Sequence, residues 1–134
     1  VWNIGQTSGY VTASQFYSYE RSGSTWTGIV GLVYPSDYGY ATSGGSTSRA
    51  TCLSTGLHKW SNASDCYNNN WLHTSANYWT MNCQNASWVN AYGGNLYLQP
   101  PTDTLLIRPV VFLKASVKIT GGSGTSGSPY ILGT

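Results

Sequence analysis

Two short runs of strand-forming residues surround a pair of glycines and predict a β-hairpin in the second half of the chain. Residues 88–92 and residues 95–98 flank Gly93-Gly94. A glycine pair readily adopts the positive φ angles that tight hairpin turns require, so this spacing predicts two antiparallel strands. Any fold for this chain must therefore accommodate antiparallel β structure between residues 88 and 98.

One other segment carries a helical pattern. In residues 48–60, Leu53, Leu57 and Trp60 recur at i, i+4 and i+7, the spacing of one helix face. This is the one main helix that the sequence predicts. Residues 11–19 fit either a short helix that begins after Thr12 or an extended edge.

Short strands with turn-forming residues between them account for most of the remaining chain. Ser36-Asp37 predicts an N-cap for a single helical turn through residues 40 and 41. Residues 105–114 are the most apolar run and are expected to form a central strand, with Pro109 marking a bulge or an edge. The sequence thus predicts an α+β fold with one main helix, short antiparallel strands and much irregular structure. The other expected strands are residues 26–34, 78–81, 116–120 and 129–132.

The length of 134 residues suits a single domain, spanning residues 1–134. Charged residues make up only 7% of the chain, whereas disordered chains combine high charge with few aromatic residues. Six Trp and 11 Tyr argue instead for a folded core. A chain whose solubility depends on Ser, Thr, Asn, Gly and Tyr resembles secreted β-rich surface proteins and binding loops in composition.

The charge pattern and the apolar runs exclude two classes of partner. The net charge of +2 comes from six scattered basic residues, so there is no basic stripe for nucleic acid. The longest apolar run, residues 105–113, is interrupted by Arg108 and Pro109 and falls short of the roughly 18 residues that span a membrane. With neither a signal peptide nor an initiating Met, contact with a membrane is expected only through an anchor upstream of Val1.

The three cysteines leave two pairing states open. Cys52 and Cys66 flank a short polar segment, and a disulfide between them fits an oxidising, extracellular compartment. Cys83 is then a free thiol or an intermolecular partner. The alternative is three reduced, buried thiols. The sequence contains no C-x-x-C motif and its two histidines are isolated, so no metal site is expected.

Catalytic groups are scarce in this chain. A hydrolytic triad would need most of the four acids, and the acids are too far apart in sequence to suggest a calcium site. The sequence therefore predicts no enzymatic activity and no cofactor. An enzyme would require a deep pocket that holds His73 with Asp65 or Asp103. The four acids are Glu20, Asp37, Asp65 and Asp103.

The segment from residue 82 to residue 106 is rich in Asn and Tyr and is the predicted ligand-binding surface. Rigid amphipathic rings beside adaptable amides make good contacts at low entropic cost. In a single sequence, a solvated face and a binding face look identical. The candidate ligand-binding residues are Asn82, Asn85, Asn90, Tyr92, Asn95 and Tyr97, on an expected hydrophobic frame of Trp79, Met81, Trp88, Leu96 and Leu98.

Motifs along nearly the whole chain carry a resemblance to one family. They include residues 11–21 (VTASQFYSYER), 31–42 (GLVYPSDYGYAT), 70–72 (NWL), 79–81 (WTM), 108–114 (RPVVFLK) and 117–122 (VKITGG). With these motifs the chain resembles the C-terminal ectodomain of prepilin-like surface proteins of gut Firmicutes. The resemblance implies a C-type-lectin-like fold, similar in layout to formylglycine-generating-enzyme-like domains. The reactive cysteines of the enzyme branch have no counterpart here, so that activity is not implied.

Some members of this family resemble variable proteins of diversity-generating retroelements, in which mutagenesis of Asn codons randomises exposed positions. The resemblance implies a variable segment at about residues 82–106. The positions that such mutagenesis can reach are Asn82, Cys83, Asn85, Asn90, Tyr92, Asn95 and Tyr97, whereas Trp79, Met81, Gln84, Trp88 and Gln99 would be fixed.

These features lead to two hypotheses. The first is an extracellular, ligand-binding domain of adhesin or receptor type on a pilin-like bacterial surface protein. Its partner would be a protein or glycan on another cell, a phage or a host. The alternative is a structural pilin-like subunit that uses the same face to assemble with sister subunits.

Overall fold

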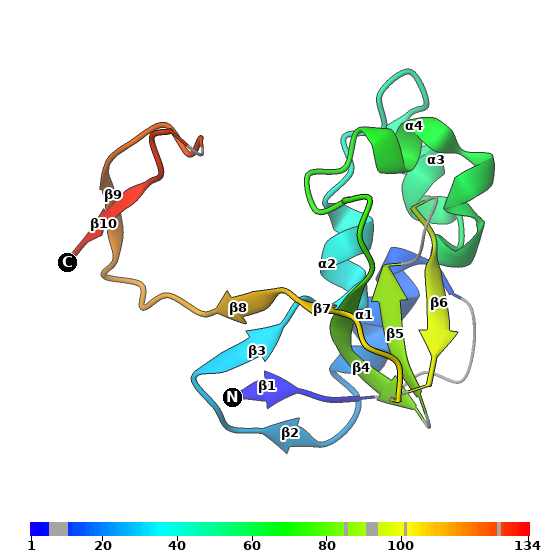
Figure 1. Cartoon of the computed structure of the whole chain (residues 1–134), viewed down its shortest axis with the longest axis horizontal. Coiled ribbons are helices and arrows are strands. Elements are labelled where there is room, and N and C mark those ends of the chain that lie inside the picture. The colour runs from blue at the N-terminus through cyan, green and yellow to red at the C-terminus, as the bar shows by residue number, and fades with distance from the viewer. Residues whose placement is uncertain (6–10, 85, 91–93, 101, 126) are drawn as a thin grey trace.

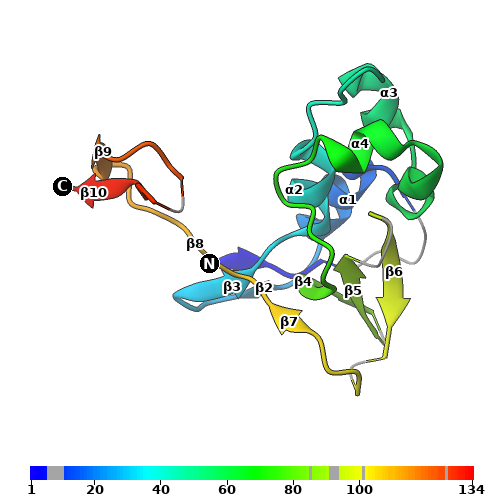
Figure 2. The same cartoon turned by 45° about the horizontal axis from the view of Figure 1, so that its top comes forward.

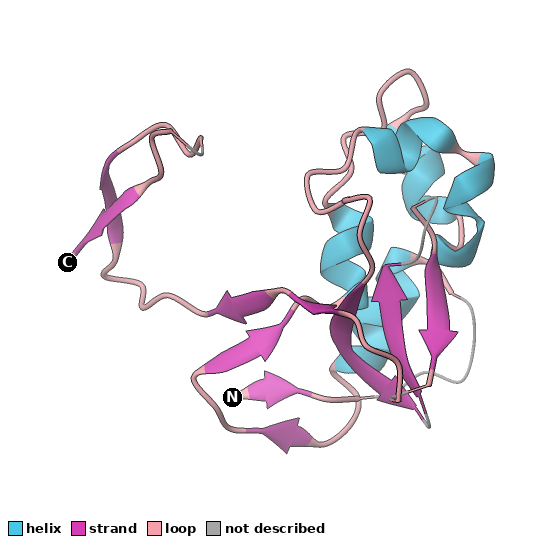
Figure 3. Cartoon of the chain, viewed as in Figure 1, coloured by secondary structure: helices cyan, strands magenta, loops and turns pink. Residues whose placement is uncertain are grey.

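The computed structural model describes the chain except residues 6–10, 85, 91–93, 101 and 126. Of the other residues between 83 and 90 it describes the backbone alone. Helices gather on one side of a four-stranded sheet, and a C-terminal hairpin stands away from both (Figures 1 and 3). The mixture of helices and antiparallel strands confirms the predicted α+β class.

Short elements make up the fold. The helices are α1 (Ala13–Glu20), α2 (Pro35–Tyr40), α3 (Arg49–Ser54), the 3-10 helix η1 (Leu57–Asn62) and α4 (Ser64–Asn68). The strands are β1 (Trp2–Asn3), β2 (Thr25–Trp26), β3 (Val30–Leu32), β4 (Tyr78–Gln84), β5 (Ala86–Asn90), β6 (Leu96–Gln99), β7 (Leu106–Ile107), β8 (Pro109–Val111), β9 (Lys118–Gly121) and β10 (Ile131–Gly133).

The four-stranded sheet has the order β6-β5-β4-β7. Strands β5 and β6 are antiparallel, with Trp88 opposite Leu98 and Asn90 opposite Leu96, which confirms the predicted hairpin pairing. Strand β7 runs parallel to β4, so the expectation of antiparallel strands is wrong at this edge. The pairs β1–β2, β3–β8 and β9–β10 are separate antiparallel ladders.

Helix α1 resolves the choice that residues 11–19 left open. Thr12 is its N-cap: the Thr12 side chain accepts a hydrogen bond from the Gln15 N–H, and the Gln15 side chain accepts one from the Thr12 N–H at 3.0 Å. This reciprocal capping box satisfies two N–H groups that a helix start otherwise leaves unpaired. Ala13, Phe16 and Glu20 form the buried face of the helix.

The predicted main helix over residues 48–60 is wrong. Helix α3 begins at the expected place, with Ser48 as N-cap, but Thr55 and Gly56 adopt extended backbone angles. The Leu57 N–H then donates to the Val11 carbonyl at 3.1 Å, and the chain continues as η1. Glycine favours a break because it loses the most backbone freedom in a helix. Among the described residues the longest helix is therefore α1, and the expectation of one main helix is also wrong.

Helix α2 begins one residue before the predicted cap. Tyr34 is the N-cap and Pro35 occupies the first turn, where a missing N–H costs nothing. Ser36 therefore lies inside the helix, and its hydroxyl donates to the Glu20 carboxylate at 2.5 Å.

The core lies between the helices and the sheet. Its largest buried members are Trp60, Tyr38, Phe16, Leu57 and Leu96. The rings of Tyr38 and Trp60 are 5.5 Å apart, and the Tyr38 hydroxyl donates to the Gly94 carbonyl at 2.6 Å. The hydrogen bond from Tyr38 to Gly94 therefore links helix α2 to the β5–β6 hairpin.

The prediction of a central strand over residues 105–114 is wrong. The segment splits into β7, at the edge of the four-stranded sheet, and β8, which pairs with β3. Pro109 has no N–H to donate to a ladder, which suits an edge position better than a central one. Apolar side chains such as Ile107 and Phe112 consequently remain exposed.

Candidate functional site

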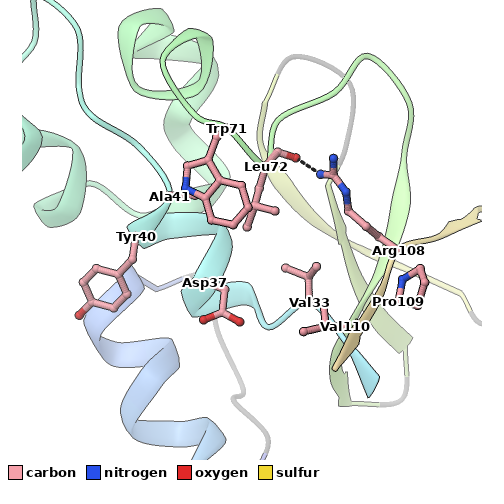
Figure 4. Close-up of a pocket in the computed structure, with 9 residues that line it drawn as sticks. All are labelled: Val33, Asp37, Tyr40, Ala41, Trp71, Leu72, Arg108, Pro109 and Val110. Atoms are coloured by element: carbon pink, nitrogen blue, oxygen red, sulfur yellow. Dashed lines mark hydrogen bonds between the residues drawn. The ribbon is translucent and has the colours of Figure 1, made fainter. Parts of the chain in front are cut away.

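A groove of about 520 Å³ opens beside helix α2 (Figure 4). One wall is α2 with the residue that follows it, another is the loop after α4, and a third comes from the start of β8 and the residue before it. The lining residues are Val33, Asp37, Tyr40, Ala41, Trp71, Leu72, Arg108, Pro109 and Val110.

Asn70 determines which side chains of the loop enter the core and which face the groove. Its amide N–H donates to the Tyr38 carbonyl at 2.8 Å, and its side-chain oxygen accepts from the Leu72 N–H at 2.8 Å. Both bonds are buried, so the loop is held firmly against the end of α2. As a result Leu72 points inward, while the Trp71 side chain is 75% exposed at the groove (Figure 4).

Arg108 is fixed on the opposite wall. Its guanidinium donates to the Leu72 carbonyl and lies 5.2 Å from the centre of the Tyr78 ring. The Tyr78 hydroxyl donates to the same carbonyl at 3.0 Å, and burial raises the pKa of that hydroxyl. A hydrogen bond to the Leu72 carbonyl and a cation–π contact with Tyr78 therefore hold Arg108 in place before any ligand arrives.

Asp37 supplies a carboxylate on the α2 wall. It lies in the first turn of α2, and in Figure 4 it stands between Tyr40 and Val33. Partial burial raises its pKa, and a hydrogen bond to the Tyr34 backbone opposes that shift. The groove thus has an acid on one wall and a guanidinium on another.

These groups suit non-covalent recognition. Binding grooves typically combine an apolar lining with a few fixed polar groups, and here Val33, Ala41 and Leu72 supply the apolar part. Trp71 offers a flat ring that can stack on the apolar face of a ligand. A ligand with one apolar face and polar edges would match this arrangement.

Two of the predicted ligand-binding residues are buried and do not lie at the surface. Asn82 and Asn95 are each 2% exposed. Asn82 donates to the Gly5 carbonyl at 3.2 Å, and Asn95 accepts from the Ser61 N–H at 2.6 Å. The expectation that these two amides are displayed is therefore wrong, because they satisfy backbone groups inside the fold.

The other predicted positions in residues 82–106 differ in how far they are described. Asn85 and Tyr92 lie outside the described residues, and of Asn90 only the backbone is described, paired with Leu96. Tyr97 is exposed, and its hydroxyl accepts from the Asn95 amide at 2.8 Å. Tyr97 is thus the predicted ligand-binding residue that the structure places at the surface.

The expected hydrophobic frame is only partly internal. Leu96 is fully buried, and Trp79 and Met81 are partly buried. Leu98 is 42% exposed, so its assignment to the frame is wrong. The side chain of Trp88 lies outside the described part of the structure.

The groups that an enzyme was expected to need are not in the groove. The Asp65 carboxylate accepts from the hydroxyls of Ser46 and Thr47, which lower its pKa. His73 packs against the Tyr67 ring, 5.1 Å between centres, and burial lowers its pKa. Across the described residues, no group of three His, Cys, Asp or Glu side chains is placed to hold a metal ion.

Sequence reasoning missed the residues around the groove. In the sequence, Trp71 stands out only within a motif that carries the family resemblance, and Arg108 only in such a motif and as the charge that interrupts the apolar run 105–113. Of the two Asn70 contacts that turn Trp71 outward, the one to Tyr38 joins positions 32 residues apart, and no local pattern reports such a contact.

Replacement of Asn95 by alanine is expected to lower the free energy of unfolding by about 2 kcal/mol. The variant removes the buried Asn95 side chain and leaves the Ser61 N–H without its acceptor at a part-buried contact. Chemical denaturation followed by fluorescence measures the change. Tyr97→Ala, which removes an exposed side chain whose hydroxyl accepts from the Asn95 amide, should cost much less. Equal losses for both variants would contradict the structural role of Asn95.

Comparison of the chain with protein-family models, with curated proteins and with solved structures finds no match. Within the described part of the chain, none of the helices combines the length and apolarity needed to cross a bilayer. The groove and the chemistry of its walls are therefore the features that bear on function.

Proposed function

We propose that this chain is the ligand-binding domain of an extracellular, pilin-like bacterial surface protein of C-type-lectin-like fold, and that the groove beside α2 is its principal binding site. The observation that carries the proposal is the outward-facing Trp71 ring above a groove with Asp37 and Arg108 on its walls. Recognition, not catalysis, is the function that these groups support.

An exposed tryptophan on a fixed backbone supports a binding role. Tryptophan is enriched among the residues that dominate binding energy, and its large ring loses little conformational entropy on contact. The buried Asn70 contacts position the backbone of Trp71 in advance, so less ordering is required when a ligand binds.

The extracellular location is supported by the bridge between Cys52 and Cys66. Disulfides persist in oxidising compartments and are rare in reducing ones. The ligand that we propose is a glycan or protein on another cell, a phage or a host surface. Its apolar face would stack on Trp71, and its polar edge would bond to Asp37.

The proposal also includes diversification within residues 82–106, at fewer positions than the sequence predicted. Asn82 and Asn95 are buried, so they belong to the frame. The positions left for variation are Cys83, Asn85, Asn90, Tyr92 and Tyr97. Comparison of paralogues within one genome tests this: invariance at these five positions would refute a variable receptor.

Replacement of Trp71 by alanine is expected to weaken ligand binding at least tenfold, or about 1.4 kcal/mol. The full chain is first screened against a glycan array and against intact bacterial and host cells. Every ligand that the wild type binds is then measured with the variant by biolayer interferometry.

Two further variants locate the site. Trp26→Ala removes an exposed tryptophan from β2, outside the groove lining, and should bind as the wild type does. Tyr97→Ala tests the surface of residues 82–106. Loss of binding in Tyr97→Ala with full binding in Trp71→Ala would move the site to that surface and refute the groove.

A further inference from the structure

The C-terminal end of the chain forms an arm that stands away from the rest of the molecule (Figures 1 and 2). This C-terminal arm, residues 114–134 without residue 126, contains β9, β10 and the described part of the loop between them. Hydrogen bonds close the loop: the N–H groups of Ser123 and Gly124 both donate to the Ser128 carbonyl, at 2.9 and 3.0 Å. The arm is therefore a formed hairpin without a supporting layer.

The hairpin exposes apolar side chains along its strands. Ile119 and Leu132 are direct cross-strand partners, so they share one face. Ile119 is 61% exposed and Leu132 is half exposed, and Tyr130 and Ile131 are also exposed. A two-stranded hairpin alone is at best marginally stable in water, so this face needs a surface to cover it.

A matching apolar face lies on the body of the molecule. Val30 of β3 and Val111 of β8 are cross-strand partners, and each is about half exposed. Their neighbours in the ladder, Gly31 and Val110, point to the other side, where the Trp2 ring lies against Gly31. We call the exposed side of this ladder, with Val30 and Val111, the β3–β8 face.

The path of the chain keeps the arm from covering its own β3–β8 face. Phe112 is held against the Trp2 ring, 4.4 Å between centres, on the opposite side of the ladder. A turn follows at once, closed by the Val117 N–H and the Lys114 carbonyl at 3.0 Å. Beyond this turn the arm leads away from the body in both views (Figures 1 and 2).

The accessible surface area of the chain exceeds that of a compact chain by about the area of one interface. The accessible surface is 7815 Å², whereas a compact chain of 14.5 kDa exposes about 6,900 Å². The excess of about 900 Å² is close to the roughly 800 Å² that each partner buries in a standard protein–protein interface.

Charge also favours a second copy over an anionic partner. Lys114 and Lys118 carry the entire net charge of +2, and the rest of the chain has equal numbers of basic and acidic residues. Two lysines are too few for strong binding to nucleic acid or an anionic membrane. Two nearly neutral bodies, by contrast, approach each other with little repulsion.

From these observations we infer that two copies of the chain exchange their C-terminal arms, each hairpin covering the β3–β8 face of the other copy. Such an interface is isologous and closes as a two-fold dimer. The dimer leaves residues 82–106 out of the contact, unlike a pilin-like assembly through that segment.

Sedimentation equilibrium of the full chain tests the inference. The expected mass is twice 14.5 kDa, falling to 14.5 kDa at high dilution. Ile119→Asp and Val111→Asp should each halve the mass at concentrations where the wild type is dimeric, with native near-ultraviolet circular dichroism. The matched control is Leu98→Asp, also at an exposed leucine, which should remain dimeric.

A mixing experiment separates exchange between copies from folding within one chain. Ile119→Lys and Val111→Asp chains are each expected to be monomeric alone. Mixed, they should pair, because lysine arms meet aspartate faces in one contact and native side chains meet in the other. Three outcomes overturn the inference: a monomeric wild type, dissociation by Leu98→Asp alone, or sedimentation of the wild type with neutral lipid vesicles instead of self-association.

Discussion

Replacement of both Cys52 and Cys66 by alanine is expected to lower the free energy of unfolding by about 3 kcal/mol. The bridge joins α3 to α4, with 5.5 Å between the two Cα atoms and both side chains fully buried. It closes a loop with a sequence separation of 14 residues, which includes all of η1. Removing it frees that loop in the unfolded chain, and the entropy gained there favours unfolding.

The measurement is urea denaturation with and without dithiothreitol. The reductant should shift the midpoint of the wild type and leave the double alanine variant unchanged, although the variant retains Cys83. If the reductant left the wild type unchanged as well, the three cysteines would be reduced thiols and the bridge would be absent.

Replacement of Glu20 by glutamine is expected to stabilise the protein at pH 8 by up to about 3 kcal/mol and to have little effect near pH 4.5. Burial raises the pKa of Glu20 to about 7. The Ser36 hydroxyl and N–H donate to its carboxylate, at 2.5 and 3.0 Å, and lower the pKa only in part. The nearby charges are Asp37, which raises the pKa, and Arg21, which lowers it.

The sign of the change in stability follows from the difference in proton binding between the folded and the unfolded state. Because the folded-state pKa lies above the unfolded value of 4.5, the folded state binds the proton more tightly. The stabilising contribution of Glu20 is complete below pH 4.5 and is lost as the pH rises through 7. Glutamine remains neutral throughout, and its oxygen can still accept from Ser36.

Thermal or urea unfolding from pH 4 to pH 9 measures this effect as the difference between wild type and Glu20→Gln. Taking the difference cancels the contributions of other groups, such as His58 and His73, whose pKa values are lowered by burial. Stability profiles that run parallel across this range would show that Glu20 does not titrate near pH 7.

Local sequence signals predicted local structure well. The glycine pair at 93 and 94 predicted the pairing of β5 with β6 because hairpin partners are close in sequence. Of the two alternatives that the sequence left open for residues 11–19, the structure has the helix after Thr12, begun by a capping box with Gln15. These interactions span only a few residues, so the amino-acid pattern contains nearly all of the relevant information.

The wrong predictions of secondary structure have one cause in common: contacts between residues that are far apart in the sequence. The helix over residues 48–60 breaks where Leu57 bonds to Val11, and apolar periodicity does not report that partner. The apolar run 105–114 suggested a central strand, yet it forms two edge strands because its partners are β4 and β3. The apolar content of a segment indicates that its side chains favour burial. It does not indicate which surface they pack against.

The candidate site was predicted least well. Asn and Tyr between residues 82 and 106 looked alike in sequence, but Asn82 and Asn95 are buried and Tyr97 is exposed. Buried amides that satisfy backbone groups have the same composition as displayed ones. Only the partners, Gly5 for Asn82 and Ser61 for Asn95, tell them apart.

The anchoring of the β5–β6 hairpin has a consequence for engineering. On one side of residues 91–93, Asn90 is fixed by its pairing with Leu96. On the other side, Gly94 is held by the Tyr38 hydroxyl. A long flexible insertion between two fixed points would cost little, since each doubling of its length adds only about 0.6 kcal/mol. Foreign peptides grafted between Asn90 and Gly94 would therefore enter a scaffold whose core does not depend on the inserted sequence.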